Sequence, residues 1–145
     1  MGQYWIPVNL DKKEFICPHK LGSGLKLWEQ LASSPGTGGA LIVLTAAMPE
    51  ARGGGDLSLR DESDEAYTEI AEQTIGRWAG DRIALVGDYA DADDLPAEFE
   101  ADKIFDQCEE DGEYTDITHL VCAVIEHELE GEFDGGGWKD FVRNE

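Results

Sequence analysis

The chain has 145 residues, with 11 Lys and Arg side chains against 32 Asp and Glu side chains, and its formal net charge is −21. Proteins that bind nucleic acids or anionic membranes need clustered Lys and Arg to neutralise phosphate groups, so the charge argues against both as direct partners. No apolar run approaches the roughly 20 residues that span a bilayer, and the first residues lack a secretory signal pattern, so we expect a soluble, cytoplasmic protein.

The length and composition suit a single folded domain. One chain of 145 residues, of which 41% are hydrophobic, can build a core of useful size. Its three cysteines, Cys17, Cys108 and Cys122, are odd in number and widely spaced, unlike a disulfide framework. We therefore expect residues 1–145 to form one domain with reduced, mostly buried thiols.

The first predicted element is a β-hairpin. Apolar side chains alternate over residues 4–8, and extended character resumes over residues 14–17 after a turn at residues 9–13. Pro7 cannot donate a backbone hydrogen bond, so it should face a sheet edge or a bulge. Residues 17–24 then form a loop.

Two apolar segments follow the loop. Residues 25–32 carry an apolar stripe that predicts a helix, with Ser23 as its N-cap. Residues 39–48 are almost continuously apolar, and their β-branched content favours a central strand, although the alanines would also suit a buried helix. Periodicity does not separate these two alternatives.

The later part of the chain predicts two helices and one strand. Residues 61–75 are typical of a helix with a polar face, and residues 82–89 form the clearest strand. A further helix, capped by Thr115 or Asp116, runs to about Leu129 with apolar residues at intervals of three and four.

Strands and helices in this mixed order indicate an α+β fold. We predict a small mixed, largely antiparallel sheet with two or three packed helices and an acidic face. The last segment contains Trp138 and Phe141, and we expect it to dock on this body.

The negative charge belongs to one part of the chain. Residues 1–60 contain 6 basic and 5 acidic side chains, a net charge of +1, whereas residues 61–145 contain 5 basic and 27 acidic ones, a net charge of −22. Residues 88–113 alone carry 12 carboxylates, opposed only by Lys103. Such a block is commonly a disordered, solvated tail.

Apolar side chains argue against a free tail in the acidic part, residues 88–134. Leu95, Phe99 and Phe105 interrupt the run, so the carboxylates are expected on folded elements. These three could anchor a partner, but we favour core packing for them.

Localised carboxylates on a rigid scaffold can imitate the phosphate rows of a nucleic acid and occupy a basic groove. Adaptation to high salt would spread the charge more evenly along the chain, so the localisation favours binding. The residues that we expect to contact such a partner are Asp91, Asp93, Asp94, Glu98, Glu100, Asp102, Asp106, Glu109, Glu110 and Asp111.

No set of residues identifies an enzyme or a cofactor site. The glycine-rich stretches 22–24 and 36–39 lack the Lys and the Ser or Thr of a phosphate-binding P-loop, and no nucleophile elbow is present. We therefore expect no enzyme, no catalytic residue and no cofactor.

Metal binding is not expected either. The acidic residues 88–94 lack the central Gly and final Glu of a calcium loop. Two groups of zinc-type ligands are incomplete, and we interpret them as a core Cys with flanking His residues. These groups are Cys17 with His19, and His119 with Cys122 and His127.

A set of short motifs lies within roughly the first 90 residues. They are Met1-Gly2-Gln3-Tyr4, Asn9 to Glu14, Pro18-His19-Lys20, Gly22 to Leu27, Gly53 to Asp56, Gly76 to Ile83 and Gly87-Asp88-Tyr89. Together they resemble an uncharacterised family of small bacterial and phage proteins. The resemblance implies a phage or mobile-element setting and carries over no catalytic residue.

That setting and the acidic surface together suggest a non-enzymatic inhibitor of a host defence complex, of the anti-CRISPR or anti-restriction kind. Its partner would be a basic nucleic-acid-binding protein or a ribonucleoprotein complex. Two alternatives stay open: residues 18–20 and 76–82 could line a ligand-binding or catalytic pocket, or the chain could be an acidic housekeeping protein of a salt-adapted host.

Overall fold

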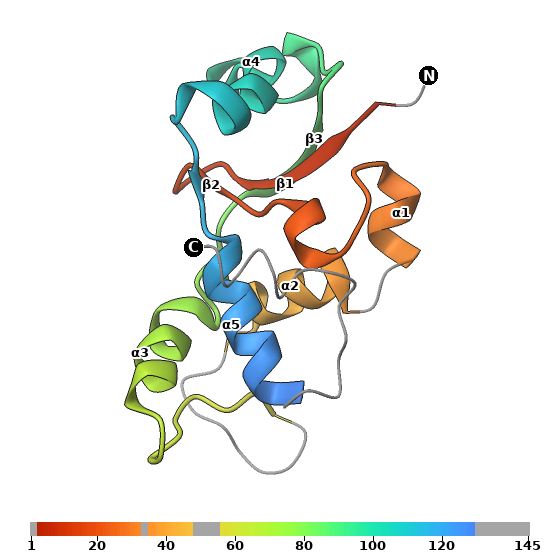
Figure 1. Ribbon diagram of the computed structural model, residues 1–145. Helices are drawn as coiled ribbons and strands as arrows, with labels where there is room; N and C mark the ends of the chain where they lie inside the picture. The colour runs from red at the N-terminus through yellow and green to blue at the C-terminus, as the bar shows by residue number, and fades with distance from the viewer. Residues whose placement is uncertain (1–2, 33–34, 48–55, 130–145) are drawn as a thin grey trace.

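The computed structural model describes residues 3–32, 35–47 and 56–129. These residues contain a four-stranded sheet (Figure 1). The strand order is β3-β1-β2-β4. β1 pairs antiparallel with β2 and β3, and β2 pairs parallel with β4. The strands are β1 (Trp5–Asn9), β2 (Glu14–Phe15), β3 (Ile83–Gly87) and β4 (Thr115–Asp116). The predicted α+β class, with its mixed and largely antiparallel sheet, is confirmed.

Pro7 lies in an inner strand, not at the edge or bulge that we expected. In β1, Val8 pairs with Phe15, the last residue of β2. Pro7 therefore lies opposite Ile16, just beyond the end of β2, and its carbonyl accepts a hydrogen bond from the Ile16 N–H at 3.2 Å. On its other side β1 continues to pair with β3, where Pro7 lies opposite Leu85. The position of the missing proline N–H faces Ile16, where β2 has already ended, so no ladder is interrupted.

The described residues form five α-helices, more than the two or three expected. They are α1 (Leu27–Ala32), α2 (Gly36–Thr45), α3 (Glu65–Thr74), α4 (Ala101–Asp106) and α5 (Thr118–Leu129). Four short turns of other helical types accompany them: η1 (Pro18–Leu21), η2 (Ala92–Asp94), η3 (Ala97–Phe99) and η4 (Gln107–Asp111), the last of which is π-helical. α4 covers one face of the sheet, and the other four helices lie on the opposite side (Figure 1).

The strand favoured for residues 39–48 is wrong, because residues 39–45 belong to helix α2. Its buried residues, Gly36, Thr37, Ala40, Val43 and Leu44, recur at intervals of three and four, as one face of a helix requires. The outer face is apolar as well, which conceals this periodicity in the sequence.

The helix ends agree in part with the predicted caps. Thr118 at the start of α5 donates its N–H to Asp116 Oδ1 at 2.9 Å, as expected for an Asp cap. Ser23 does not cap α1; its Oγ accepts from the Thr37 N–H at 3.3 Å. The start of α1 is held by Glu29, whose Oε1 accepts from the Lys26 N–H at 3.1 Å.

Two hydrophobic clusters lie on the two sides of the sheet. The first joins α2, α3 and α5 around the fully buried Trp78, and the second joins α4 to β1. Cys122 lies in the first cluster, Cys108 in the second and Cys17 is half-buried, and all three are free thiols, as predicted. The final segment with Trp138 and Phe141 lies outside the described residues.

Candidate functional site

The predicted acidic residues lie on a folded cap over one face of the sheet. We call residues 88–113, which connect β3 to β4 through η2, η3, α4 and η4, the acidic cap. Its buried side chains Ile104, Phe105 and Cys108 pack against Ile6 and Val8 of β1. Burial of each large apolar side chain is worth about 1.5–3 kcal/mol, enough to hold the cap on the sheet.

The aromatic and aliphatic side chains of the cap serve this packing. Phe105 is buried, and Leu95 and Phe99 are partly buried against the same cluster. The interpretation of all three as core residues is therefore confirmed. Because they face the sheet, the polar residues between them face outward.

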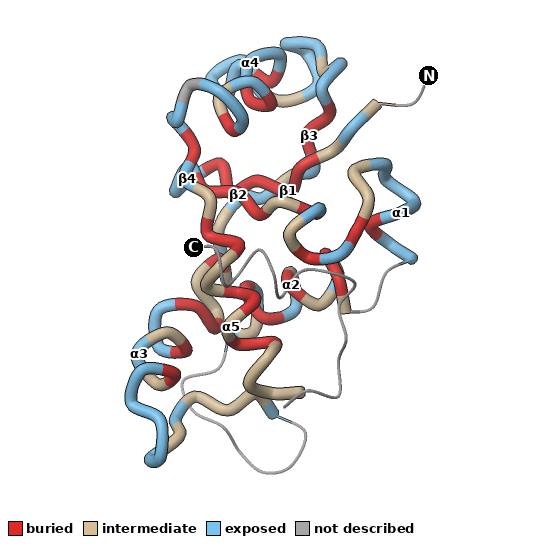
Figure 2. The backbone as a smooth tube through the Cα atoms, viewed as in Figure 1, coloured by how far each residue is buried: buried red, intermediate tan, exposed pale blue. Residues whose placement is uncertain are grey.

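The carboxylates of the cap are exposed to solvent (Figure 2). The exposed acidic residues of the cap are Asp88, Asp91, Asp93, Asp94, Glu98, Glu100, Asp102, Asp106, Glu109, Glu110 and Glu113. The side chain of Asp111 lies outside the description. The structure thus places nine of the ten predicted site residues at exposed positions of the cap.

Two carboxylates also define the local backbone. Asp94 Oδ2 accepts from the Asp91 N–H at 2.9 Å, and the Asp91 side chain accepts from the Asp94 N–H, so the pair forms a capping box around η2. Glu100, the N-cap of α4, has a left-handed backbone conformation with φ of 50°. Part of the acidity therefore serves the fold of the cap.

Few cations neutralise the cap. Lys103 Nζ lies 3.1 Å from Glu100 Oε1, which raises the pKa of Lys103. Arg82 approaches Glu98 at 3.9 Å and stacks 4.7 Å above the ring of Phe99, but its shorter bond, 2.7 Å, goes to Asp11 outside the cap. Lys13 Nζ lies 3.7 Å from Glu113 Oε2 at the end of the cap. Within the described residues, the other exposed carboxylates of the cap form no ion pair.

The unpaired carboxylates follow helical spacing. Asp102 and Asp106 are four residues apart on α4, which separates their Cβ atoms by about 5–6 Å. Glu109 and Glu110 follow on the π-helical turn η4, a conformation that is rare and often found at functional sites. Like charges at this spacing repel, so the arrangement costs stability that the packing beneath it must offset.

The motif at residues 76–82 has a structural role that the sequence did not reveal. Arg77 binds Glu14 through two nitrogens, and the Trp78 indole N–H donates to Glu14 Oε1 at 3.0 Å. Asp81 accepts from the Asn9 amide at 2.8 Å. This segment therefore ties the hairpin to the start of β3, and we call these contacts the hairpin latch.

Residues 18–20 are likewise engaged in structure. Pro18 is buried, and Lys20 Nζ forms an ion pair with Asp116 Oδ2 at 2.9 Å. His19 is exposed. A pocket common to residues 18–20 and 76–82 stays a prediction.

Two of the candidate zinc ligands on α5 have different neighbours. On α5, Cys122 points into the core, whereas His127 lies 2.8 Å from Asp61 Oδ2 and stacks on Tyr67 with 3.6 Å between ring centroids. Across the described residues, no cluster of three or more His, Cys, Asp or Glu side chains has a metal-binding arrangement.

The buried thiols lack the features of nucleophiles. Burial raises the pKa of Cys108 to about 12 and also raises the pKa of Cys17. Activated cysteines instead have a lowered pKa from a neighbouring cation or helix N-terminus.

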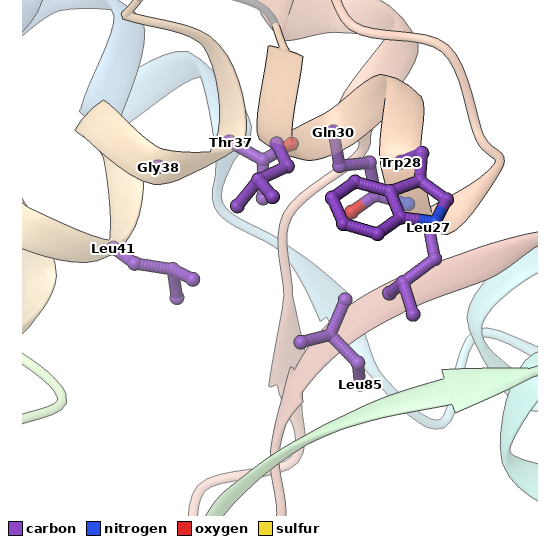
Figure 3. Close-up of a pocket in the computed structure, with 8 residues that line it drawn as sticks. Leu27, Trp28, Gln30, Thr37, Gly38, Leu41 and Leu85 are labelled. Carbon is purple, nitrogen blue, oxygen red and sulfur yellow. The ribbon is translucent and has the colours of Figure 1, made fainter.

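A second surface, missed by the sequence analysis, lies on the other side of the sheet. An apolar pocket of about 290 Å³ opens between α1, α2 and β3 (Figure 3). It is lined by Leu27, Trp28, Gln30, Leu31, Thr37, Gly38, Leu41 and Leu85. The walls of this pocket come from segments far apart in the chain, so the sequence does not predict it. The apolar outer face of α2 is the one local signal of its presence.

Comparisons with protein-family models, with curated proteins and with solved structures give no match. None of the helices in the described part of the chain is both long and apolar enough to cross a membrane.

Proposed function

We propose that the acidic cap binds a basic, nucleic-acid-binding protein or ribonucleoprotein complex by imitating the charge of a nucleic acid. The observation that carries this proposal is the eleven exposed carboxylates, nine of them predicted contact residues, on one packed cap that contains a single Lys and no Arg. In the wider proposal the protein is a non-enzymatic inhibitor of a host defence complex in the cytoplasm, of the anti-CRISPR or anti-restriction kind.

Simple solvation explains the cap less well. Residues 1–60 have a net charge of +1, so the chain does not need dense acidity everywhere to remain dissolved. Concentrating like charges on one small surface costs stability through self-repulsion. A partner with cations complementary to the cap would explain why its carboxylates are concentrated despite this loss of stability.

The mechanism is electrostatic and steric. A row of fixed carboxylates attracts a basic groove over distances near the Debye length, about 10 Å at 0.1 M salt, and so accelerates encounter. Once seated, the cap excludes the nucleic acid that the groove would otherwise hold. Binding should therefore weaken as salt increases and should compete with DNA or RNA.

The test is charge reversal at two matched sites. Asp93, Asp94, Glu109 and Glu110 are changed together to Lys on the cap. The control variant changes Glu62, Glu65, Glu69 and Glu72 to Lys in and beside α3, where all four side chains are also exposed. The two variants have the same net charge, so they differ only in where it changes.

Each variant is used to capture proteins from host lysate, and the captured complexes are challenged with duplex DNA and with salt. We expect the wild type and the α3 variant to retain a basic nucleic-acid-binding protein that DNA displaces, and the cap variant to lose it by at least tenfold. Equal losses in both variants would favour the acidic housekeeping alternative. Retention by both would show that the cap is not the binding surface.

A further inference from the structure

The apolar pocket has an unusually exposed rim. Trp28 is 78% exposed, Leu31 72% and Leu27 47%, and all three lie on α1 and line the pocket with Leu85 of β3. Figure 3 shows Leu27 and Trp28 on the same side of the pocket as Leu85. Large apolar side chains gathered around a concavity commonly mark a binding site, whereas single exposed ones need no explanation.

Two polar side chains of the pocket lack the partners that burial requires. Gln30 is 4% exposed and Thr37 is 3% exposed, and among the described residues neither Gln30 Oε1 nor Thr37 Oγ1 has a hydrogen-bond partner. Most buried polar groups are hydrogen-bonded, and an unpaired one costs about as much as a lost hydrogen bond.

The orientation of the Gln30 amide is fixed by its neighbours. Its Nε2 donates to the carbonyl oxygens of Trp5 at 2.7 Å and Leu25 at 2.9 Å. Since both neighbours are acceptors, the amide cannot be reversed, and Oε1 remains an acceptor without a donor. The group that would satisfy it must bring an N–H or O–H.

Gly38 leaves space in the pocket where a helix would prefer a side chain. It lies inside α2, and a Cβ built on it would meet no atom within 4 Å. Glycine within a helix costs about 0.5–1 kcal/mol relative to alanine, so neither the helix nor the packing requires it. Its presence keeps the pocket open.

We propose that the apolar pocket binds a neutral small molecule of one or two rings that donates a hydrogen bond to Gln30. No lining residue is ionisable, so the pocket offers no compensation for a charged ligand. A cavity of about 150 Å³ accommodates benzene, and a volume of about 290 Å³ therefore suits a bicyclic ring.

The ligand reaches Gln30 by a small rearrangement of the rim. The two unpaired atoms are shielded from water, so a lining side chain has to turn aside for a donor to approach them. Trp28 is the most exposed of the lining side chains and loses the least packing when it turns. Binding should therefore change the environment of the Trp28 indole.

The test uses two ring probes of nearly equal shape. Indole carries an N–H donor, and benzofuran has an oxygen at the same place. The full chain is titrated with each probe, and the methyl signals of Leu27, Leu31 and Leu85 and the indole signal of Trp28 are followed by NMR. We expect indole to bind with a millimolar or tighter dissociation constant and benzofuran to bind about tenfold more weakly.

Three variants locate the binding. Gly38→Leu should fill the pocket and Leu31→Lys should charge its rim, and each should weaken indole binding at least tenfold. Ile42→Ala is the control, because Ile42 is 67% exposed on the same helix and does not line the pocket. Circular dichroism melting verifies that each variant is folded.

Several results would overturn the proposal. Indole failing to bind, equal affinities for indole and benzofuran, or undiminished binding to Leu31→Lys and folded Gly38→Leu would each do so. A Trp138→Ala variant tests a different occupant: indole binding strengthened more than tenfold by that change would assign the pocket to the chain's own final segment.

Discussion

Glu14 is the residue on which the hairpin latch depends. It is 6% exposed, and its carboxylate receives hydrogen bonds from Arg77 and Trp78. Burial alone would raise the pKa of Glu14, but these bonds outweigh burial, and the pKa lies below its usual value. The carboxylate is therefore ionised in the folded protein at neutral pH.

Glu14→Gln should destabilise the protein by about 3 kcal/mol, because it leaves the partly buried Arg77 without its counter-charge. Urea unfolding followed by Trp fluorescence measures this loss. The matched control is Asp11→Asn, which breaks the exposed Arg82 pair and should cost clearly less. Equal losses in the two variants would show that the buried pair has no special role.

Thr37 and Thr118 are both buried, and replacement by Val should have opposite effects on stability at these two positions. Thr37→Val removes a hydroxyl that has no partner in the described part of the chain, so it should stabilise the protein by about 1 kcal/mol. Thr118→Val removes a hydroxyl that accepts from the Cys17 N–H and donates to Asp116, so it should cost about 2 kcal/mol. Thermal unfolding of both variants checks the signs, and a loss of stability in Thr37→Val would contradict the assignment of its hydroxyl as unpaired.

At the scale of elements, β1, β2, β3, α1, α3, α5 and the folded acidic cap could be predicted from the sequence because each depends on local pattern. The short strand β4 was not predicted, since its two residues lie where we expected a helix cap. α2 could not, since Leu41 and Ile42 make its outer face as apolar as its buried face, and a helical period needs a polar side to be visible. The same outer face supplies Leu41 to the apolar pocket. The local sequence pattern of α2 thus disagrees with its helical structure in the segment that lines the proposed ligand pocket.

The hairpin latch and the apolar pocket could not be predicted for a different reason. Glu14 meets Arg77, and Trp28 and Leu85 line one pocket, only after β1 pairs with both of its neighbours. Contacts between residues more than 50 positions apart leave no periodic trace in a single sequence.

The contact between Asp61, which precedes α3, and His127 of α5 gives a prediction on acid stability. The pKa of Asp61 is lowered to about 2, first by hydrogen bonds from Ser63 and then by His127 on α5. A lowered pKa in the folded state means that Asp61 stabilises the protein fully above pH 4, and that this contribution is lost as the pH falls towards 2.

Asp61→Asn should therefore be less stable than the wild type at pH 6, and the difference should vanish near pH 2. Thermal unfolding at four pH values between 2 and 6 measures it. A stability difference between Asp61→Asn and the wild type that stays constant over this range would show that the charge of the Asp61 carboxylate does not stabilise its contact with α5.

At the scale of the whole molecule, the charge of −21 predicts a strong response to salt. Increasing NaCl from 0.01 to 0.5 M screens repulsion among the cap carboxylates, so the melting temperature should rise. The melting temperature of the variant with Lys at positions 93, 94, 109 and 110 should rise less than that of the variant changed at α3. An equal rise in both would mean that the repulsion is spread over the molecule.

The two candidate surfaces lie on opposite faces of one sheet. In β1, Ile6 and Val8 point toward the acidic cap, whereas Leu85 of β3 points from the other face into the apolar pocket. A partner seated on the cap would leave the mouth of the pocket turned away from it. The protein could then carry two occupants at once, as a bridge between a cationic macromolecule and an uncharged compound, with each affinity unchanged by the other.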